Sequence, residues 1–278
     1  MASMTEVRAV DRGICKKHRD KSCLNGGPGG WACPWKQYPG RMKRNNYCGL
    51  CTECIKSCPK DNVGFFIRPF GSDRLLKGYD EMFNVIIMLV VAITFSITMG
   101  GPWAVIKDAA NITESRQLGA FVLFIGSIWT LALVVFPGLF VLAGWAANRL
   151  AGRPLSPREM TLRLAYILVP VGIFAWIAFS LPMLMVNYGY ILNVLSDPLG
   201  LGWNLLGTAD FAVHPFYPQW IPVIQGTLLL AGLYFGLTRG YLGLKMVIAD
   251  PAVRVRAMIV PAVYALLATQ ILLKLYMG

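Results

Sequence analysis

Residues 48–59 read CGLCTECIKSCP, which places four cysteines at the spacing Cys-x2-Cys-x2-Cys-x3-Cys-Pro. This spacing is the bacterial run that binds 4Fe–4S clusters, because cysteines two residues apart curl the backbone around one face of a cluster. The first three cysteines bind one cluster, and the cysteine before proline binds its neighbour. A zinc site usually pairs two Cys-x2-Cys knuckles across a longer loop, so zinc fits poorly. The stretch predicts iron–sulfur ligation.

Composition divides the chain into two parts. Of its 278 residues, 56% are hydrophobic and 14% are charged, and the mean hydropathy is +0.54, which is more apolar than a typical soluble domain. Residues 1–79, called the head, carry 15 Lys/Arg against 6 Asp/Glu and contain all seven cysteines. We predict a small bacterial-ferredoxin-like iron–sulfur domain at 1–79. An all-α integral membrane bundle of five transmembrane helices is predicted to follow at 80–278.

The start of the head bears on its compartment. Residues 1–14 contain no apolar core of the length of a secretory signal and no twin-arginine pair. We therefore expect the head in a reducing compartment, where seven cysteines are typical of metal ligation and not of disulfides. We expect its positive charge to serve anionic clusters and lipid headgroups, and not nucleic acid.

Counting ligands assigns the cysteines to clusters. Two clusters need eight ligands, and the head has seven cysteines. A cysteine followed by proline binds the neighbouring cluster in this type of run, and Cys33 and Cys58 are both followed by proline. The first predicted ligand set is Cys33, Cys48, Cys51 and Cys54. The second predicted set is Cys15, Cys23 and Cys58, which is one ligand short.

His18 can complete the second set. It follows Cys15 at the position where the second ligand of a triplet would lie. Imidazole can replace thiolate on iron and raises the reduction potential when it does. We predict two 4Fe–4S clusters, the second held by three cysteines and His18. The alternative is a solvated His18 in the basic run KKHRDK, with the second cluster three-iron or absent.

The segments beside the cysteines are less decisive. NGGPGG at 25–30 predicts a glycine-rich turn and not a phosphate loop, because no Gly-Lys-Ser/Thr ending follows it. Trp31 and Trp35 either shield a cluster from water or pack a small core. Residues 60–79 set aromatic side chains among cations, which predicts a segment at the membrane surface, with an ordinary linker as the alternative.

Five runs are long and apolar enough to cross a bilayer, which needs about 20 helical residues. The predicted spans are Met82–Met99, Leu118–Ala147, Leu164–Val186, Ile221–Leu237 and Ala257–Leu273. Pro137 is expected to kink the second span, and neighbouring helices are expected to satisfy the carbonyls that prolines free. No charged residue lies mid-span, which argues against an ion or proton pump, and no histidine pair offers ligands to haem.

The cations of the loops predict the orientation. Loops 148–163 and 238–256 hold four Lys or Arg residues each, whereas loop 187–220 holds none. We therefore predict a multi-pass protein of the inner (cytoplasmic) membrane. The head is expected in the cytoplasm and the C-terminus on the outer side.

The outer loop 187–220 is unusually apolar, which favours contact with a partner subunit. A re-entrant or interfacial helix is expected at about 198–207, a stretch too short to cross the membrane. His214 is interpreted as an interfacial histidine among aromatic residues, with a quinone or metal contact as the alternative. A quinone, if bound, is expected at the cytoplasmic edge near residues 66–84. The candidate quinone contacts are Arg68 and Asp80.

The sequence GGPGGWACPWKQYPGRMKRNNYCGLCTECIKSCPKDN resembles the cluster region of NapH/NosR-type membrane ferredoxins, and the resemblance covers about residues 15–70. It implies quinol oxidation or electron relay in a membrane subunit associated with a periplasmic reductase. Members of that family usually place several helices before the cluster domain and carry a full set of cysteines. In this chain five spans follow the cluster domain, and His18 stands at the position of a cysteine in the motif. Residues 80–278 are loosely similar to Yip1-type membrane domains, which imply no redox chemistry.

These features predict an electron-transfer subunit of an oxidoreductase complex and not a complete enzyme. It would relay electrons between a catalytic partner and the quinone pool or another carrier. The expected partners are other subunits of a membrane redox complex, the lipid bilayer and, in one reading, a quinone. The alternative is a membrane anchor or assembly protein whose clusters are structural or redox-sensing.

Overall fold

The structure is a computed structural model, and it describes residues 5–42, 45, 47–68, 76, 78–100, 107–108, 110–215 and 217–277. The chain divides into two compact units, Met1–Arg74 (unit 1) and Leu75–Gly278 (unit 2). The division falls a few residues before the predicted start of the membrane domain at residue 80. Unit 1 contains every cysteine, and unit 2 contains the long helices.

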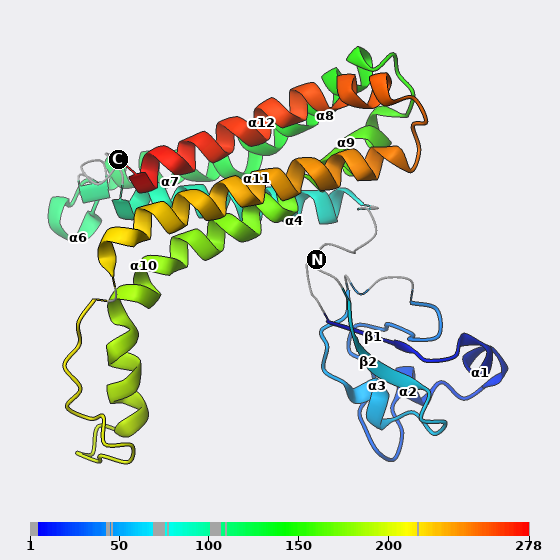
Figure 1. The fold of residues 1–278 in the computed structure, drawn as a ribbon, viewed down its shortest axis with the longest axis horizontal. Helices are drawn as coiled ribbons and strands as arrows, with labels where there is room; N and C mark the ends of the chain where they lie inside the picture. Colours follow the sequence, from blue (N-terminus) through cyan, green and yellow to red (C-terminus); the bar gives the residue numbers. More distant parts are fainter. Residues whose placement is uncertain are drawn as a thin grey trace. The chain divides into compact units, whose positions relative to one another are not determined.

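Two strands from opposite ends of unit 1 form a small sheet (Figure 1). β1 (Thr5–Ala9) pairs antiparallel with β2 (Val63–Ile67). Along β1, Val7 and Ala9 are buried while Arg8 between them is exposed, which is the period-2 alternation of a strand with one face on a core. Local sequence spacing does not reveal this pairing, because the partners lie far apart in the chain.

The pairing changes the interpretation of the segment predicted at the membrane surface. That segment, 60–79, includes β2, so its first part belongs to the sheet of unit 1. Residues 69–75 and 77 lie outside the described residues. The strand accounts for the aromatic pair Phe65 and Phe66 without a membrane contact, because aromatic residues are common in strands.

Three short helices complete the described part of unit 1. They are α1 (Arg12–Lys17), α2 (Ser22–Asn25) and α3 (Glu53–Lys56). The Asp11 carboxylate accepts a hydrogen bond from the Gly13 N–H and so caps α1. The buried core is made of Val7, Cys23, Cys54 and Val63. A core that small, with two cysteines in it, usually needs a metal or a covalent cross-link to be stable, and all seven cysteines are free.

The predicted glycine-rich turn is present. Gly27 and Gly30 pair across it, and the Trp31 N–H donates to the Glu53 carboxylate at 3.0 Å. A Cβ on Gly29 would lie 2.7 Å from the Lys56 carbonyl oxygen, so only glycine permits the turn to lie against α3. The turn therefore packs against α3, which lies within the cysteine run.

Unit 2 contains the five predicted membrane spans, which confirms a multi-pass membrane protein. Their helices are α4 (Tyr79–Gly100), α7 (Leu118–Thr130) with the π-helical turn η1 (Leu131–Val135) and α8 (Phe136–Leu150), α9 (Pro157–Ala165) with α10 (Leu168–Ser196), η2 (Pro218–Trp220) with α11 (Ile221–Lys245), and α12 (Pro251–Met277). A short helix, α6 (Ile112–Ser115), precedes α7. Every helix extends by at least three residues beyond its predicted run, because helical hydrogen bonding continues into the flanks.

The spans pack around α10, which lies beside α4 and α11, while α12 packs on α8 and α11 (Figure 1). Glycines let α11 approach α10 closely. A Cβ on Gly236 would lie 2.4 Å from the Ile167 carbonyl oxygen, and a Cβ on Gly232 would lie 2.8 Å from the Phe174 Cβ. Without a hydrophobic drive between helices in lipid, this close packing of small residues holds a bundle together.

A neighbouring helix supplies a hydrogen-bond donor to the carbonyl that a proline frees in the third span, as the sequence predicts. Pro182 has no N–H, so the carbonyl of Ala178, one turn earlier in α10, lacks its helical donor. The Gln225 side chain of α11 donates to that carbonyl at 2.8 Å. In the second span, Pro137 is the second residue after the π-helical turn η1, and such turns are a common site of helix distortion.

The helix predicted at 198–207 is wrong, because this stretch forms turns after α10 ends. Gly200, Gly202 and Gly207 have positive φ angles of 65°, 78° and 72°, which a right-handed helix cannot contain. The Asp197 carboxylate accepts from the N–H groups of residues 201 and 202 and holds the first turn. The segment returns along the end of α10 as an extended arm (Figure 1).

Candidate functional site

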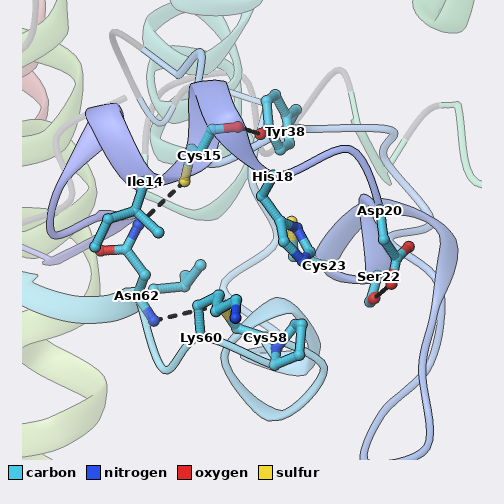
Figure 2. A pocket seen from close by; sticks show the side chains of 12 residues that line it. Ile14, Cys15, His18, Asp20, Ser22, Cys23, Tyr38, Cys58, Lys60 and Asn62 are labelled. Atoms are coloured by element: carbon cyan, nitrogen blue, oxygen red, sulfur yellow. Dashed lines mark hydrogen bonds between the residues drawn. The ribbon is translucent and has the colours of Figure 1, made fainter.

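The second predicted ligand set lines one pocket of unit 1 (Figure 2). Its members come from four places in the chain. Cys15 lies on α1, His18 ends α1, Cys23 lies on α2, and Cys58 follows α3. The structure therefore brings together three thiols and one imidazole around one small space.

The thiols of this pocket are electrostatically coupled. Burial raises the pKa of the Cys23 thiol to about 11, and the nearby thiols of Cys58 and Cys15 add to the increase. A buried thiol with a raised pKa is a poor nucleophile but becomes a thiolate when it ligates a metal. The pocket thus suits metal ligation better than covalent catalysis.

Asn62 joins two thiols of this pocket to the sheet. Its side-chain Nδ2 donates to the Cys15 Sγ at 3.2 Å, and its backbone N–H donates to the Cys58 Sγ at 3.3 Å. The same side chain donates to the Asp11 carbonyl at 2.6 Å and accepts from the Asp11 N–H at 2.9 Å. Asn62 is 4% exposed, so these contacts are shielded from water. Hydrogen bonds to sulfur are a known means of setting the potential of iron–sulfur sites.

The cysteines of the first predicted set also lie near one another. Burial raises the pKa of the Cys54 thiol to about 12, with contributions first from Cys48 and Cys51 and also from Cys33. Burial likewise raises the pKa of Cys48, and Cys33 and Cys51 contribute. Cys33, Cys48 and Cys51 therefore all lie near Cys54. Cys54 also responds to Cys23 of the second set, so the two groups adjoin within unit 1.

The backbone of the run 48–54 is shaped by two residues with left-handed conformations. Leu50 has a φ of 55° and Thr52 a φ of 62°, one on each side of Cys51. Non-glycine residues adopt such angles rarely, and they cluster at functional sites. Here they curl the chain so that Cys51 is exposed while Cys54 is buried. Cys33 accepts a hydrogen bond from the Gln37 N–H at 3.4 Å.

No three His, Cys, Asp or Glu side chains of the described residues converge on a point that would hold a single metal ion. A lone zinc ion would need four ligand atoms, each at about 2–2.3 Å. A four-iron cluster instead takes its four thiolates at four separate corners, which spreads them farther apart. The ferredoxin-like iron–sulfur domain therefore stays a prediction.

The residues predicted at a quinone edge lie in different units. Arg68 belongs to unit 1, where its guanidinium lies 3.7 Å from the Glu6 carboxylate. Asp80 belongs to unit 2 and lies in the first turn of α4 beside Glu81. Carboxylates at that end of a helix interact favourably with its dipole, which gives Asp80 a structural reason to be there. The quinone contact stays a prediction.

His214 lies in the arm that follows α10, and its side chain is exposed. No metal-binding group of the described residues includes it. The interpretation as an interfacial histidine, and the alternative of a quinone or metal contact, both stay predictions.

Asn62 is the residue of this site that spacing rules do not identify. A cysteine is recognised as a candidate ligand from its residue type alone. An asparagine in the stretch CPKDN is equally typical of an ordinary turn. Its contacts to Cys15 and Asp11 depend on the β1–β2 pairing, which brings the two ends of unit 1 together. Only the folded arrangement reveals it.

In comparisons with known protein families, curated proteins and solved structures, this chain matches none of them. The resemblance of residues 15–70 to NapH/NosR-type membrane ferredoxins therefore stays a prediction. The function has to be argued from the residues of the site.

Proposed function

We propose that this protein is a membrane-anchored iron–sulfur subunit of a larger redox complex, which relays electrons between a catalytic partner and the quinone pool or another carrier. One observation carries the proposal. Cys58 lines one pocket with Cys15, His18 and Cys23, as the crossing-over of a Cys-Pro cysteine predicts, and Cys33, Cys48 and Cys51 act on Cys54.

The chemistry of the two groups fits iron–sulfur clusters. The first offers four thiols, and the second offers three thiols and an imidazole. A 4Fe–4S cluster, when bound, supplies one-electron transfer. The chain's own residues would hold it through these side chains, exclude water through the buried Cys23 and Cys54, and donate to its sulfur ligands from Asn62 and the Gln37 N–H.

The membrane bundle would anchor these groups to the bilayer. Its five spans support a multi-pass protein, and the cations of the loops favour the inner membrane with unit 1 in the cytoplasm. In that orientation a quinone would bind at the cytoplasmic edge, near residues 66–84. Loss of quinone reduction on substituting Arg68 or Asp80 supports this placement, and unchanged activity across 66–84 counts against it.

A second function is favoured by the arm 197–215. Its turns expose several large apolar side chains: Leu199, Leu201, Trp203, Leu205 and Leu206. Such a patch suits contact with another membrane protein. The chain would then be an anchor or assembly protein whose clusters are structural or redox-sensing. Reversible cycling of the clusters with a quinol or partner enzyme favours the relay, whereas clusters that only fall apart on oxidation favour the second function.

Iron and sulfide quantitation of the purified protein tests the proposal. We expect about eight irons and eight sulfides per chain and two signals in the electron paramagnetic resonance (EPR) spectrum of the reduced protein. About four irons and one EPR signal per chain would limit the proposal to a single cluster, held by the first ligand set. Absence of both iron and sulfide after anaerobic purification would overturn it.

The ligand role of His18 is tested in the same preparation. Pulsed EPR of the reduced protein is expected to show a strongly coupled nitrogen that disappears in His18→Cys while the iron content is retained. His214→Ala is the matched control, because His214 is the other histidine of the chain and lies in unit 2. A nitrogen coupling that survives in His18→Cys would show that His18 is not a ligand.

A further inference from the structure

A second pocket of unit 1, with a volume of about 470 Å³, borders the cysteine pocket. The two pockets share Cys15, His18 and Tyr38 in their walls. The rest of the second pocket is lined by Lys16, Arg19, Lys21, Gly40 and Arg41. Its volume falls within the range of small-molecule sites, about 300–1,000 Å³.

The charges around this pocket have a single sign. Four of its eight lining residues are Lys or Arg, and none is Asp or Glu. Within the described part of unit 1, no carboxylate forms an ion pair with any of these four. A concave site lined by one sign of charge focuses the potential and attracts counter-ions. Elsewhere in the unit, Glu6 and Glu53 do pair with cations.

The walls of the pocket are fixed by contacts that do not involve these cations. The Tyr38 hydroxyl donates to the Cys15 carbonyl at 2.9 Å, and the Arg12 guanidinium donates to the Met42 carbonyl at 2.7 Å. Gly40 lies so close to α1 that a Cβ there would be 2.7 Å from the Cys15 Cβ. These contacts join the segment 15–21 to the turn 38–41. The backbone beside the cations is therefore fixed, while the four cationic side chains are exposed and Lys21 lies over the Tyr38 ring at 5.6 Å.

We propose that this pocket binds a phosphate group, carried either by a phospholipid headgroup or by a free phosphate compound. Arg19 and Arg41 offer guanidinium forks that match phosphate oxygens in pairs, while Lys16 and Lys21 add compact charges. Four cations can neutralise a doubly charged group with a surplus. Half of the lining residues are cations, so the proposed ligand is the charged group.

Inorganic pyrophosphate is the probe for the free compound. The full-length protein in phosphatidylcholine nanodiscs is titrated with it by calorimetry. We expect Lys16→Gln and Arg41→Gln each to weaken binding about tenfold, since a hydrogen bond to a charged group contributes about 1.5–3 kcal/mol. Lys17→Gln is the matched control, because Lys17 lies beside Lys16 on α1 but outside the pocket, and it should leave binding within about twofold.

Phosphatidylglycerol tests the headgroup source. Nanodiscs that contain it are analysed by native mass spectrometry for lipid that stays bound to the protein, with the same three variants. Retention that is lost in Lys16→Gln and Arg41→Gln but kept in Lys17→Gln supports a headgroup. Binding of neither probe, or an equal loss in all three variants, overturns the proposal, since the latter shows diffuse surface charge and no pocket.

A consequence for electron transfer rests on the proposed function. Because Cys15 and His18 are shared by both pockets, an anion in the cationic pocket lies beside the second ligand set. Saturating pyrophosphate is expected to lower the reduction potential of the second cluster more than that of the first. If pyrophosphate binds in the calorimeter but leaves the reduction potentials of both clusters unchanged, the coupling is refuted while the anion site stands. A protein without clusters would still give the calorimetric result, so the two failures are distinguishable.

Discussion

Asn62 shows at the scale of a single residue how unit 1 joins its fold to its candidate chemistry. One buried side chain bridges Asp11 at the end of the sheet and Cys15 of the second ligand set, and its backbone reaches Cys58. Spacing predicts which cysteines form each ligand set, and that assignment stays a prediction. Spacing does not predict the donors to their sulfur atoms, because these come from any residue that the fold brings near.

Replacing Asn62 with aspartate is expected to lower the reduction potential of the second cluster. The variant keeps the oxygen that accepts from Asp11 but loses the donor to the Cys15 Sγ and adds a negative charge. Both changes destabilise the reduced state, which carries one more electron. We expect a decrease of roughly 50 mV or more, since a hydrogen bond contributes about 1 kcal/mol and 59 mV is a tenfold change for one electron.

Redox titration followed by EPR measures this shift. Asn25→Asp adds the same charge to the same unit at an exposed position and is the matched control. A shift confined to one of two clusters, and larger than in the control, is the expected result. Equal shifts in both variants, or none, would show that Asn62 has a structural role only.

Removal of iron with a chelator is expected to leave cysteines of very different reactivity. Burial raises the pKa of Cys54 to about 12, whereas Cys51 is exposed. Only the thiolate reacts, so at pH 8 we expect iodoacetamide to modify Cys51 at least about a hundredfold faster than Cys54. Because the pKa of Cys54 lies far above the working pH, its rate should rise about tenfold per pH unit between pH 7 and 9. Mass spectrometry of alkylated peptides reads both rates, and equal rates would mean that the cluster-free unit is unfolded.

At the scale of secondary structure, the sequence predicts the long apolar helices but not the contacts between segments that are far apart in the chain. The five spans are recognisable because each helix satisfies its own backbone in lipid, so a long apolar run has few alternatives. Their ends are not recognisable, because helical residues continue into polar flanks, as in α10, which extends to Ser196. The β1–β2 pairing is missed because short strands carry little local signal. The helix expected at 198–207 fails because three glycines adopt positive φ.

The contact between Gln225 and Ala178 is expected to matter only while Pro182 is present. In the wild type, Gln225→Leu leaves the Ala178 carbonyl without a donor, which we expect to cost about 0.5–2 kcal/mol. Pro182→Ala restores a helical N–H one turn away, so the same Gln225→Leu change should then cost close to nothing.

A double-mutant cycle of thermal unfolding in detergent measures this coupling. The four proteins are the wild type, the two single variants and the double variant. A coupling free energy near zero would show that Gln225 does not replace the donor that Pro182 lacks. Gly126→Ala serves as a control for handling membrane variants, because nothing lies within 4 Å of a Cβ at that position.

At the scale of the whole molecule, the two units are stabilised by different means. Unit 2 packs apolar helices through glycine contacts and interhelical hydrogen bonds, such as the one at 2.7 Å between the Ser96 and Tyr276 hydroxyls. Unit 1 has a small core in which cysteines replace aliphatic side chains. Loss of the proposed clusters is therefore expected to lower the stability of unit 1 far more than that of unit 2. This difference follows from where the sequence places its cysteines, all of them before the first span.

The charges of the loops predict the orientation of the bundle in a membrane. The described residues contain five candidate spans, and an odd number of crossings is expected to place the segments before the first span and after the last on opposite sides. Loops 148–163 and 238–256 each hold four Lys or Arg residues, while loop 187–220 holds none, so the first two are expected in the cytoplasm. The C-terminus, which follows α12, is then expected outside.

Reporter fusions after residue 278 test this orientation in a bacterial inner membrane. We expect alkaline phosphatase to be active there and green fluorescent protein to be dark, because each requires the opposite compartment to mature. A fusion truncated after Arg153, in the first basic loop, is the internal control and should give the reverse pattern. Fluorescence at both positions would mean an even number of crossings between them. The three spans after the first basic loop would then not all cross the membrane, and the C-terminus would lie in the cytoplasm.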